Sequence, residues 1–156
     1  MNWDAIGAVG EILGAAALFA SLIYLALQIR IQNRESQLSA IHDISVGFRE
    51  SIARFVTEET MEIAFRANTD YEALTDVERV RFLVTASQYF LAWEEAFVQH
   101  EIGRLPDRKW QSIQNFYVNG LGFPSMQRAW SLRRGLFDPD LADYVDSQVV
   151  AEYVTM

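Results

Sequence analysis

Residues 12–27 read ILGAAALFASLIYLAL, a sixteen-residue stretch that carries no charge and has Ser21 as its one plainly polar residue. Extended to Ile29, the segment has 18 residues, which in α-helical form are about 27 Å long. The hydrocarbon core of a bilayer is about 30 Å thick. The stretch therefore predicts a membrane-spanning helix near the N-terminus.

The flanks of this stretch favour a retained anchor over the alternative of a cleaved signal peptide. A signal peptide has a basic start and a small-residue cleavage site, whereas this chain starts with Met-Asn-Trp-Asp and offers no convincing site. Arg30 and Arg34 follow the stretch, and no Lys or Arg precedes it. The positive-inside rule then predicts a single-pass protein of the inner (cytoplasmic) membrane, with its N-terminus outside and its C-terminal domain in the cytoplasm.

Length and composition predict an anchor over residues 1–30 and one helical domain over residues 31–156. Hydrophobic residues make up 51% of the 156 residues, enough for a core. The chain has no cysteine, which excludes disulfides and thiolate metal sites. Outside the anchor, with Asp4, Glu11 and Arg30 set aside, 19 acids face 12 bases. An acidic domain repels phosphate, so nucleic acid is not an expected partner.

Small residues recur on one face of the predicted membrane helix at spacings of three and four. They are Gly7, Gly10, Gly14, Ala17 and Ser21. Gly10 and Gly14 form a GxxxG pair, which allows two helix backbones to approach closely in lipid. We expect this face to pack against a second copy or another membrane protein, although small residues are also abundant in membrane helices generally.

Glu11 stands at the outer edge of the apolar run, beside this small-residue face. In one interpretation it is an intramembrane carboxylate of an oligomer, acting as a proton or cation site, because a lone charge in lipid is costly. In the other it lies among the lipid headgroups, which fits a span from Ile12 to Ile29 without strain.

The rest of the chain has helical periodicity and almost no strand pattern. The predicted helices run from the membrane segment to about Val56, from Glu58 to Ala67, from Thr75 to Gly103, from Asp107 to Asn119, from Ser125 to Arg134 and from Pro139 to Glu152. Thr57 and Asp107 are predicted N-caps, and Thr75 with Glu78 is a predicted capping box. Short connections then predict an all-α protein, with an antiparallel helical bundle after the anchor.

The helix after Thr75 has the clearest apolar pattern. The stripe predicted to face the core is Val80, Leu83, Val84, Ser87, Phe90, Leu91, Phe97 and Val98. Glu94 falls on this stripe, and His100 and His42 are the only histidines that could join it in a buried polar site. Such a site could bind a metal or transfer protons. Di-metal bundles, however, use a Glu-x-x-His pair on one helix, and the chain has none, so no metal is assigned.

The alternative for Glu94 is an ion pair with Arg49, Arg54 or Arg133 that sets helix register. The aromatic residues likewise admit two interpretations, a ligand pocket or simply core. They are Tyr89, Trp93, Trp110, Phe116, Tyr117, Phe123, Trp130 and Phe137. The sequence contains no nucleophile elbow, phosphate loop or dinucleotide fingerprint, so no catalytic residue and no cofactor are assigned.

Several segments resemble a family of small bacterial membrane proteins of uncharacterised function. They are residues 3–15, residues 24–30, residues 89–94, Gln99, His100, Gly103, Leu105, Trp110, Trp130 and residues 137–139. The resemblance implies an N-terminal anchor on a helical domain and supplies no catalytic residues. It also implies that Glu11 and Glu94 belong to recurring motifs.

Three functions follow as hypotheses. The first is a non-enzymatic, membrane-anchored accessory or scaffold subunit, which self-associates or docks on a larger membrane complex. The second is an oligomeric ion or proton pathway lined by Glu11. The third and weakest is a metal-dependent bundle enzyme that uses Glu94, His100 and His42.

Overall fold

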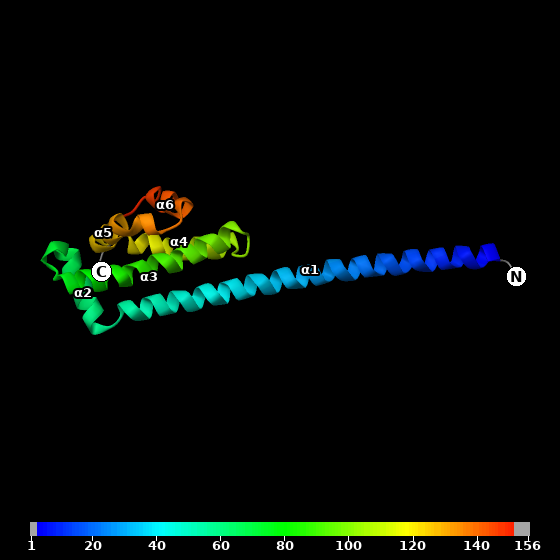
Figure 1. The fold of residues 1–156 in the computed structure, drawn as a ribbon, viewed down its shortest axis with the longest axis horizontal. Helices are drawn as coiled ribbons and strands as arrows, with labels where there is room; N and C mark the ends of the chain where they lie inside the picture. Colours follow the sequence, from blue (N-terminus) through cyan, green and yellow to red (C-terminus); the bar gives the residue numbers. More distant parts are fainter. Residues whose placement is uncertain (1–2, 152–156) are drawn as a thin grey trace. The chain divides into compact units, whose positions relative to one another are not determined.

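The computed structural model describes residues 3–151, apart from the side chains of residues 4–6. All regular elements in this range are helical, which confirms the all-α prediction. The elements are α1 (Trp3–Phe55), α2 (Glu58–Thr69), the 3-10 helix η1 (Tyr71–Ala73), α3 (Asp76–Glu101), α4 (Asp107–Gly120), α5 (Pro124–Arg133), the 3-10 helix η2 (Arg134–Leu136) and α6 (Pro139–Asp146) (Figure 1). The chain forms two compact units, Met1–Leu38 and Ser39–Met156.

The first unit consists of the N-terminal part of α1. Every residue from Gly7 to Leu27 is exposed to solvent. In the described part of the chain, α1 is the one helix long and apolar enough to cross a membrane, over residues Gly7–Phe55. This confirms a long apolar N-terminal helix ahead of a helical domain, while the predicted membrane boundary at residue 30 stays a prediction.

Side chains cap three helix starts in the second unit, two of them as predicted from sequence. The hydroxyl of Thr57 accepts a hydrogen bond from the Thr60 amide at 3.3 Å. Thr75 and Glu78 form the predicted capping box at the start of α3. Asp138 caps α6 by accepting a hydrogen bond from the backbone amide of Asp140 at 2.8 Å. These caps satisfy amides that have no partner inside the helix.

One predicted cap and one predicted helix end are wrong. Pro106, rather than Asp107, is the N-cap of α4, and no side chain caps this helix. The last helix stops at Asp146, well before the predicted end at Glu152, which lies outside the described residues. The side chain of Gln148 instead donates to the carbonyl oxygen of Tyr144 at 3.0 Å, and the chain leaves the helix.

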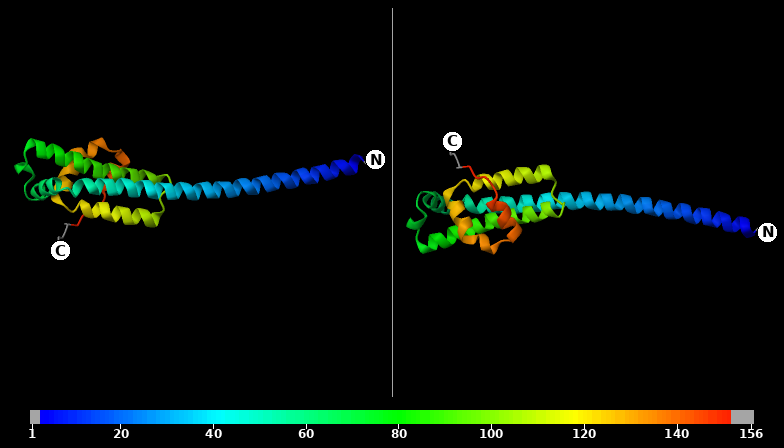
Figure 2. Two further views of the ribbon diagram at one scale, coloured as in Figure 1. Left: turned by 90° about the horizontal axis from the view of Figure 1, so that it is seen from below. Right: turned by 90° about the horizontal axis from the view of Figure 1, so that it is seen from above.

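The core of the second unit is aromatic and centres on α3, which packs against α2, α4 and α5 (Figure 2). Trp93 of α3 stacks on Tyr117 of α4, with ring centroids 5.2 Å apart. Phe90 of α3 meets Trp130 of α5 at 5.0 Å. Six of the eight predicted aromatic residues are buried: Tyr89, Trp93, Trp110, Tyr117, Trp130 and Phe137. These six residues belong to the core, and Tyr89 also lines an apolar cavity together with Phe116 and Phe123 of the same set.

The predicted core stripe of α3 is largely wrong. Only Phe90 and Phe97 of its members are buried, and the helix turns a different face inward. The buried face is Phe82, Ala86, Tyr89, Phe90, Trp93, Ala96 and Phe97. The opposite face carries an exposed apolar line, the α3 stripe, consisting of Val77, Val80, Val84, Leu91, Val98 and Ile102. The helix is apolar on both sides, so periodicity alone could not select the buried one.

Candidate functional site

The predicted helix-packing face of α1 is open along its described length. A Cβ atom added at Gly7, Gly10 or Gly14 would meet nothing within 4 Å. The hydroxyl of Ser21 donates to the carbonyl oxygen of Ala17 at 2.9 Å, so this polar group is satisfied within the helix itself. The face can therefore contact lipid or another helix without an unpaired hydroxyl.

Glu11 lies one residue after Gly10 and is exposed. Among the described residues, its carboxylate forms no hydrogen bond or ion pair. At the other end of the apolar run, the side-chain amide of Gln28 donates to the hydroxyl of Tyr24 at 2.7 Å. The polar pair thus lies inside the apolar run near its C-terminal end, and its hydrogen bond satisfies both side chains within the helix.

Glu94 is half-buried, and it has a backbone partner instead of an arginine. The amide of Asp138 donates a hydrogen bond of 2.7 Å to Oε1 of Glu94. In the described range no arginine forms an ion pair with Glu94, so the predicted pairing with Arg49, Arg54 or Arg133 is wrong. Glu94 instead joins α3 to the start of α6, whose cap is Asp138 itself.

The other two members of the candidate polar site lie elsewhere. His100 stacks on Trp110, with centroids 5.0 Å apart, and its Nδ1 lies 3.3 Å from the carbonyl oxygen of Leu105. His42 is exposed on α1. Across residues 3–151, no three His, Asp or Glu side chains form a group that could hold a metal ion. The fold does not bring Glu94, His100 and His42 together in such a group.

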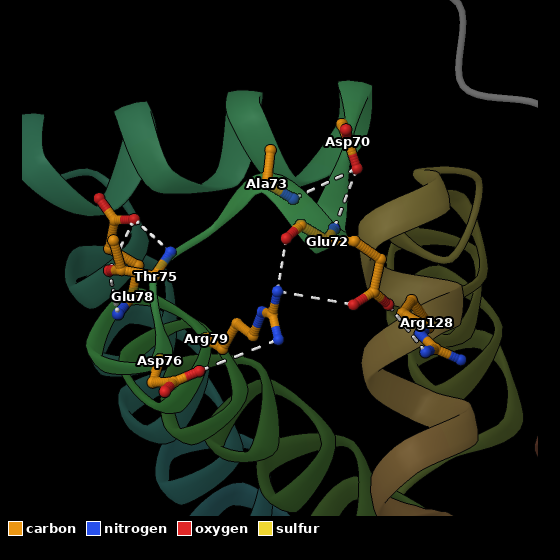
Figure 3. A network of polar contacts seen from close by, with 8 residues as sticks. All are labelled: Asp70, Glu72, Ala73, Thr75, Asp76, Glu78, Arg79 and Arg128. Atoms are coloured by element: carbon orange, nitrogen blue, oxygen red, sulfur yellow. Dashed lines mark hydrogen bonds and ion pairs between the residues drawn. The ribbon is translucent and has the colours of Figure 1, made fainter.

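A network of polar contacts connects α2, η1, α3 and α5 where these elements lie close together (Figure 3). The carboxylate of Asp70 accepts hydrogen bonds from the amides of Glu72 at 3.0 Å and Ala73 at 3.3 Å. The Glu72 carboxylate lies 3.1 Å from Arg128 and 3.6 Å from Arg79. Most of these side chains are exposed, and surface ion pairs contribute about 0–1 kcal/mol each. The network therefore joins η1 to α3 and α5 through Glu72.

Among the carboxylates of this region, Glu78 has the most clearly shifted pKa. Arg66 donates a hydrogen bond to its carboxylate, and the backbone amide and hydroxyl of Thr75 each donate another at 2.9 Å. These donors stabilise the charged carboxylate and lower the pKa of Glu78 to about 2. Since each of them serves the capping box or joins α2 to α3, the shift reflects folding rather than catalysis.

The second unit contains an apolar cavity with a volume of about 260 Å³, and three of the aromatic residues for which a ligand pocket was one interpretation, Tyr89, Phe116 and Phe123, line it. Its walls come from α2, α4, the end of α1, Tyr89 of α3 and the start of α5. The residues are Ile52, Phe55, Met61, Ala64, Phe65, Asn68, Tyr89, Phe116, Asn119, Gly120, Phe123, Ser125 and Met126. Met61, Phe65 and Phe116 are exposed, so the cavity reaches the molecular surface.

Two contacts shape this cavity. The hydroxyl of Tyr89 lies 3.1 Å from the carbonyl oxygen of Tyr117 and presses against Gly120. Burial raises the pKa of Tyr89, with a smaller contribution from Tyr117, so the phenol stays neutral. Elsewhere on the wall, the amide of Ser125 donates to Oδ1 of Asn68 at 3.1 Å. Only a residue without a side chain fits at position 120, because an added Cβ atom would lie 2.9 Å from Cζ of Tyr89 and closer still to its hydroxyl.

The chain was compared with protein-family models, with curated proteins and with solved structures, and none of them matches it.

Proposed function

We propose that this protein is a non-enzymatic, membrane-anchored accessory or scaffold subunit, which self-associates or docks on a larger membrane complex. The observation that carries the proposal is the exposure of every residue from Gly7 to Leu27 in an apolar helix. Removing one Leu, Ile or Phe side chain from water contributes about 1.5–3 kcal/mol. A stretch of this length in water would be strongly unfavourable, whereas a bilayer accommodates it.

The small-residue face supports association within the membrane. Gly10 and Gly14 leave the helix backbone uncovered on one side, with open space around both positions. In lipid, helices associate through close backbone packing, since the lipid tails are as apolar as leucine. A second copy or a partner helix that packs on this face gains contacts that lipid chains supply less well.

The second unit offers a separate apolar surface, the α3 stripe. Its members range in exposure from 43% for Val98 to 73% for Val77. Several large apolar side chains exposed along one helix face are a feature of interaction sites on soluble domains. The acidic charge of the chain adds to this argument, because it disfavours direct binding of the domain to an anionic leaflet. A protein partner fits the stripe better than a lipid surface.

The proposed orientation rests on the arginines at the end of the apolar run. Arg30 and Arg34 follow it, and both lie in α1. Under the positive-inside rule, they favour a cytoplasmic second unit and an inner-membrane location. Cysteine-labelling of Ser39→Cys with a membrane-impermeant reagent in intact cells tests this orientation, and labelling without lysis would contradict it.

The central test measures association of the full-length protein in mild detergent by cross-linking and mass determination. We expect oligomers, or a stable complex with a membrane partner, that Gly14→Ile weakens several-fold by blocking backbone approach. Ala16→Ile is the matched control, because successive residues are about 100° apart and residue 16 lies on the opposite side of the helix. A lone monomer that recovers no partner from native membranes would overturn the proposal.

A further inference from the structure

The cavity in the second unit has a chemistry distinct from the surfaces described so far. None of its lining residues carries a charged side chain. The polar side chains among them are Asn68, Tyr89, Asn119 and Ser125. A cavity without charged groups cannot compensate a carboxylate or an ammonium for its lost hydration. Its occupant must therefore be neutral.

Some of the hydrogen-bonding groups that line the cavity already have partners within the protein. The Tyr89 hydroxyl is directed at the carbonyl oxygen of Tyr117, and Oδ1 of Asn68 accepts from the Ser125 amide. Nδ2 of Asn68 donates no hydrogen bond to any described residue. Asn68 is half-buried and is one of the few polar residues that line this mostly apolar space. Nδ2 is therefore available to donate a hydrogen bond to an oxygen atom of a bound molecule.

The volume of the cavity bounds the size of its occupant. An enclosed apolar cavity of about 150 Å³ in another protein holds benzene. The present cavity, at about 260 Å³, has room for a molecule of roughly eight to ten carbon atoms. Met61 and Met126 on its wall have flexible side chains that adapt to different apolar shapes.

We propose that this cavity binds a neutral, predominantly apolar small molecule whose single carbonyl or hydroxyl oxygen accepts a hydrogen bond from Nδ2 of Asn68. The apolar part lies against Ile52, Met61 and Phe65, and the oxygen points towards Asn68. This site lies wholly within the second unit. The proposal goes beyond the accessory function and does not depend on association in the membrane.

Methyl NMR of the full-length protein in lipid nanodiscs tests the site directly. Two of the four methionines, Met61 and Met126, line the cavity, so their methyl signals report on its contents. Titration with 1-octanol is expected to shift both signals to saturation, whereas octanoate at pH 7.5 leaves them in place. Absence of a saturable shift with 1-octanol, or equal binding of octanoate, would overturn the proposal.

Two variants with one matched control separate specific binding from partitioning into lipid. Ala64→Leu fills the cavity and should abolish the shifts, whereas Ala53→Leu adds the same atoms at an exposed position outside it and should not. Asn68→Asp keeps the oxygen that accepts from Ser125 but removes the Nδ2 donor. It should weaken octanol binding roughly threefold to tenfold. Unchanged shifts in Ala64→Leu, or unchanged octanol affinity in Asn68→Asp, would refute the assigned site.

Discussion

The hydroxyl group of Tyr89 lies against Gly120 and occupies the space that a Cβ atom at position 120 would need. The hydroxyl is held there by its approach to the carbonyl oxygen of Tyr117 at 3.1 Å. Tyr89 is almost completely buried, so the ring has no room to retreat. A hydroxyl at position 89 and a side chain at position 120 therefore exclude each other.

Gly120→Ala is expected to destabilise the second unit by about 1–3 kcal/mol, the usual cost of overpacking a close-packed core. Thermal or urea unfolding measures the change. Tyr89→Phe combined with Gly120→Ala should recover part of the loss, since the phenyl carbon Cζ would still lie 2.9 Å from the new Cβ. Gly135→Ala is the control, because nothing lies within 4 Å of a Cβ there. Equal effects at positions 120 and 135 would contradict the packing.

The lowered pKa of Glu78 predicts that the folded protein loses stability as the solution is made acidic. Its pKa is lowered to about 2 in the folded protein from an ordinary value of 4.5. Charged Glu78 therefore contributes stability above pH 4.5, and this contribution is lost as the pH falls from there towards 2. Glu78→Gln should flatten the dependence of the free energy of unfolding on pH in this window. Glu62→Gln, at an exposed position of α2, should leave it unchanged, and a curve unaltered by Glu78→Gln would disprove the assignment.

Glu94 is expected to act through its hydrogen bond to the Asp138 amide. Glu94→Ala removes the acceptor and should lower the free energy of unfolding by about 0.5–1.5 kcal/mol. Glu94→Gln retains an oxygen acceptor and should lose less than half of that. Glu95→Ala changes an exposed neighbour and serves as the control. Denaturant unfolding of the three variants measures these differences. If Glu94→Gln were as unstable as Glu94→Ala, the charge of Glu94 would matter in addition to its oxygen acceptor.

The two faces of α3 predict opposite responses to truncation. Phe82→Ala empties a fully buried position and should cost about 3–5 kcal/mol. Val84→Ala, on the α3 stripe, should stay within about 0.5 kcal/mol of the wild type, as surface substitutions usually do. Unfolding measurements on the two variants therefore test which face is core. A large loss from Val84→Ala would restore the stripe predicted from sequence.

A test of proton uptake through Glu11 distinguishes the proposed accessory function from the alternative of a proton pathway. The proposed accessory function places Glu11 at the headgroup level, so wild-type protein in liposomes should show no proton uptake above that of empty liposomes. The measurement uses a pH-sensitive dye inside the vesicles under an imposed membrane potential. Uptake by the wild type that disappears in Glu11→Gln, with assembly intact, would instead establish the alternative of a proton pathway.

Local sequence signals predicted the positions of the helices closely. Thr57, the pair of Thr75 and Glu78, and Asp138 each bond to amides a few residues away, so the cap and its helix lie in the same short segment. The exception at Asp107 has a local cause, since Pro106 takes the cap position just before it. The early end of the last helix involves a distant residue, because Gln148 also accepts a hydrogen bond from Gln114 of α4 at 3.0 Å.

The candidate sites depended on distant contacts and were predicted less well. Glu94 was placed on a helix face next to aromatic residues, but its partner, the Asp138 amide, is 44 residues away. No rule of residue spacing predicts that a carboxylate in one helix will accept a hydrogen bond from the backbone amide just before a different helix. The cavity was harder still to predict, because residues from five helices line it and its shape depends on the contact between Tyr89 and Gly120.

The sequence by itself determined the apolar helix at the N-terminus, the all-α class and the helix starts, because these depend on composition, period and caps within short segments. Tertiary structure decided which face of α3 is buried, since both faces are apolar and only packing against α2, α4 and α5 selects one. It also decided that Glu94 accepts from a backbone amide and that a cavity opens beside Gly120. These features arise from space left or filled between helices, which one-dimensional patterns do not encode.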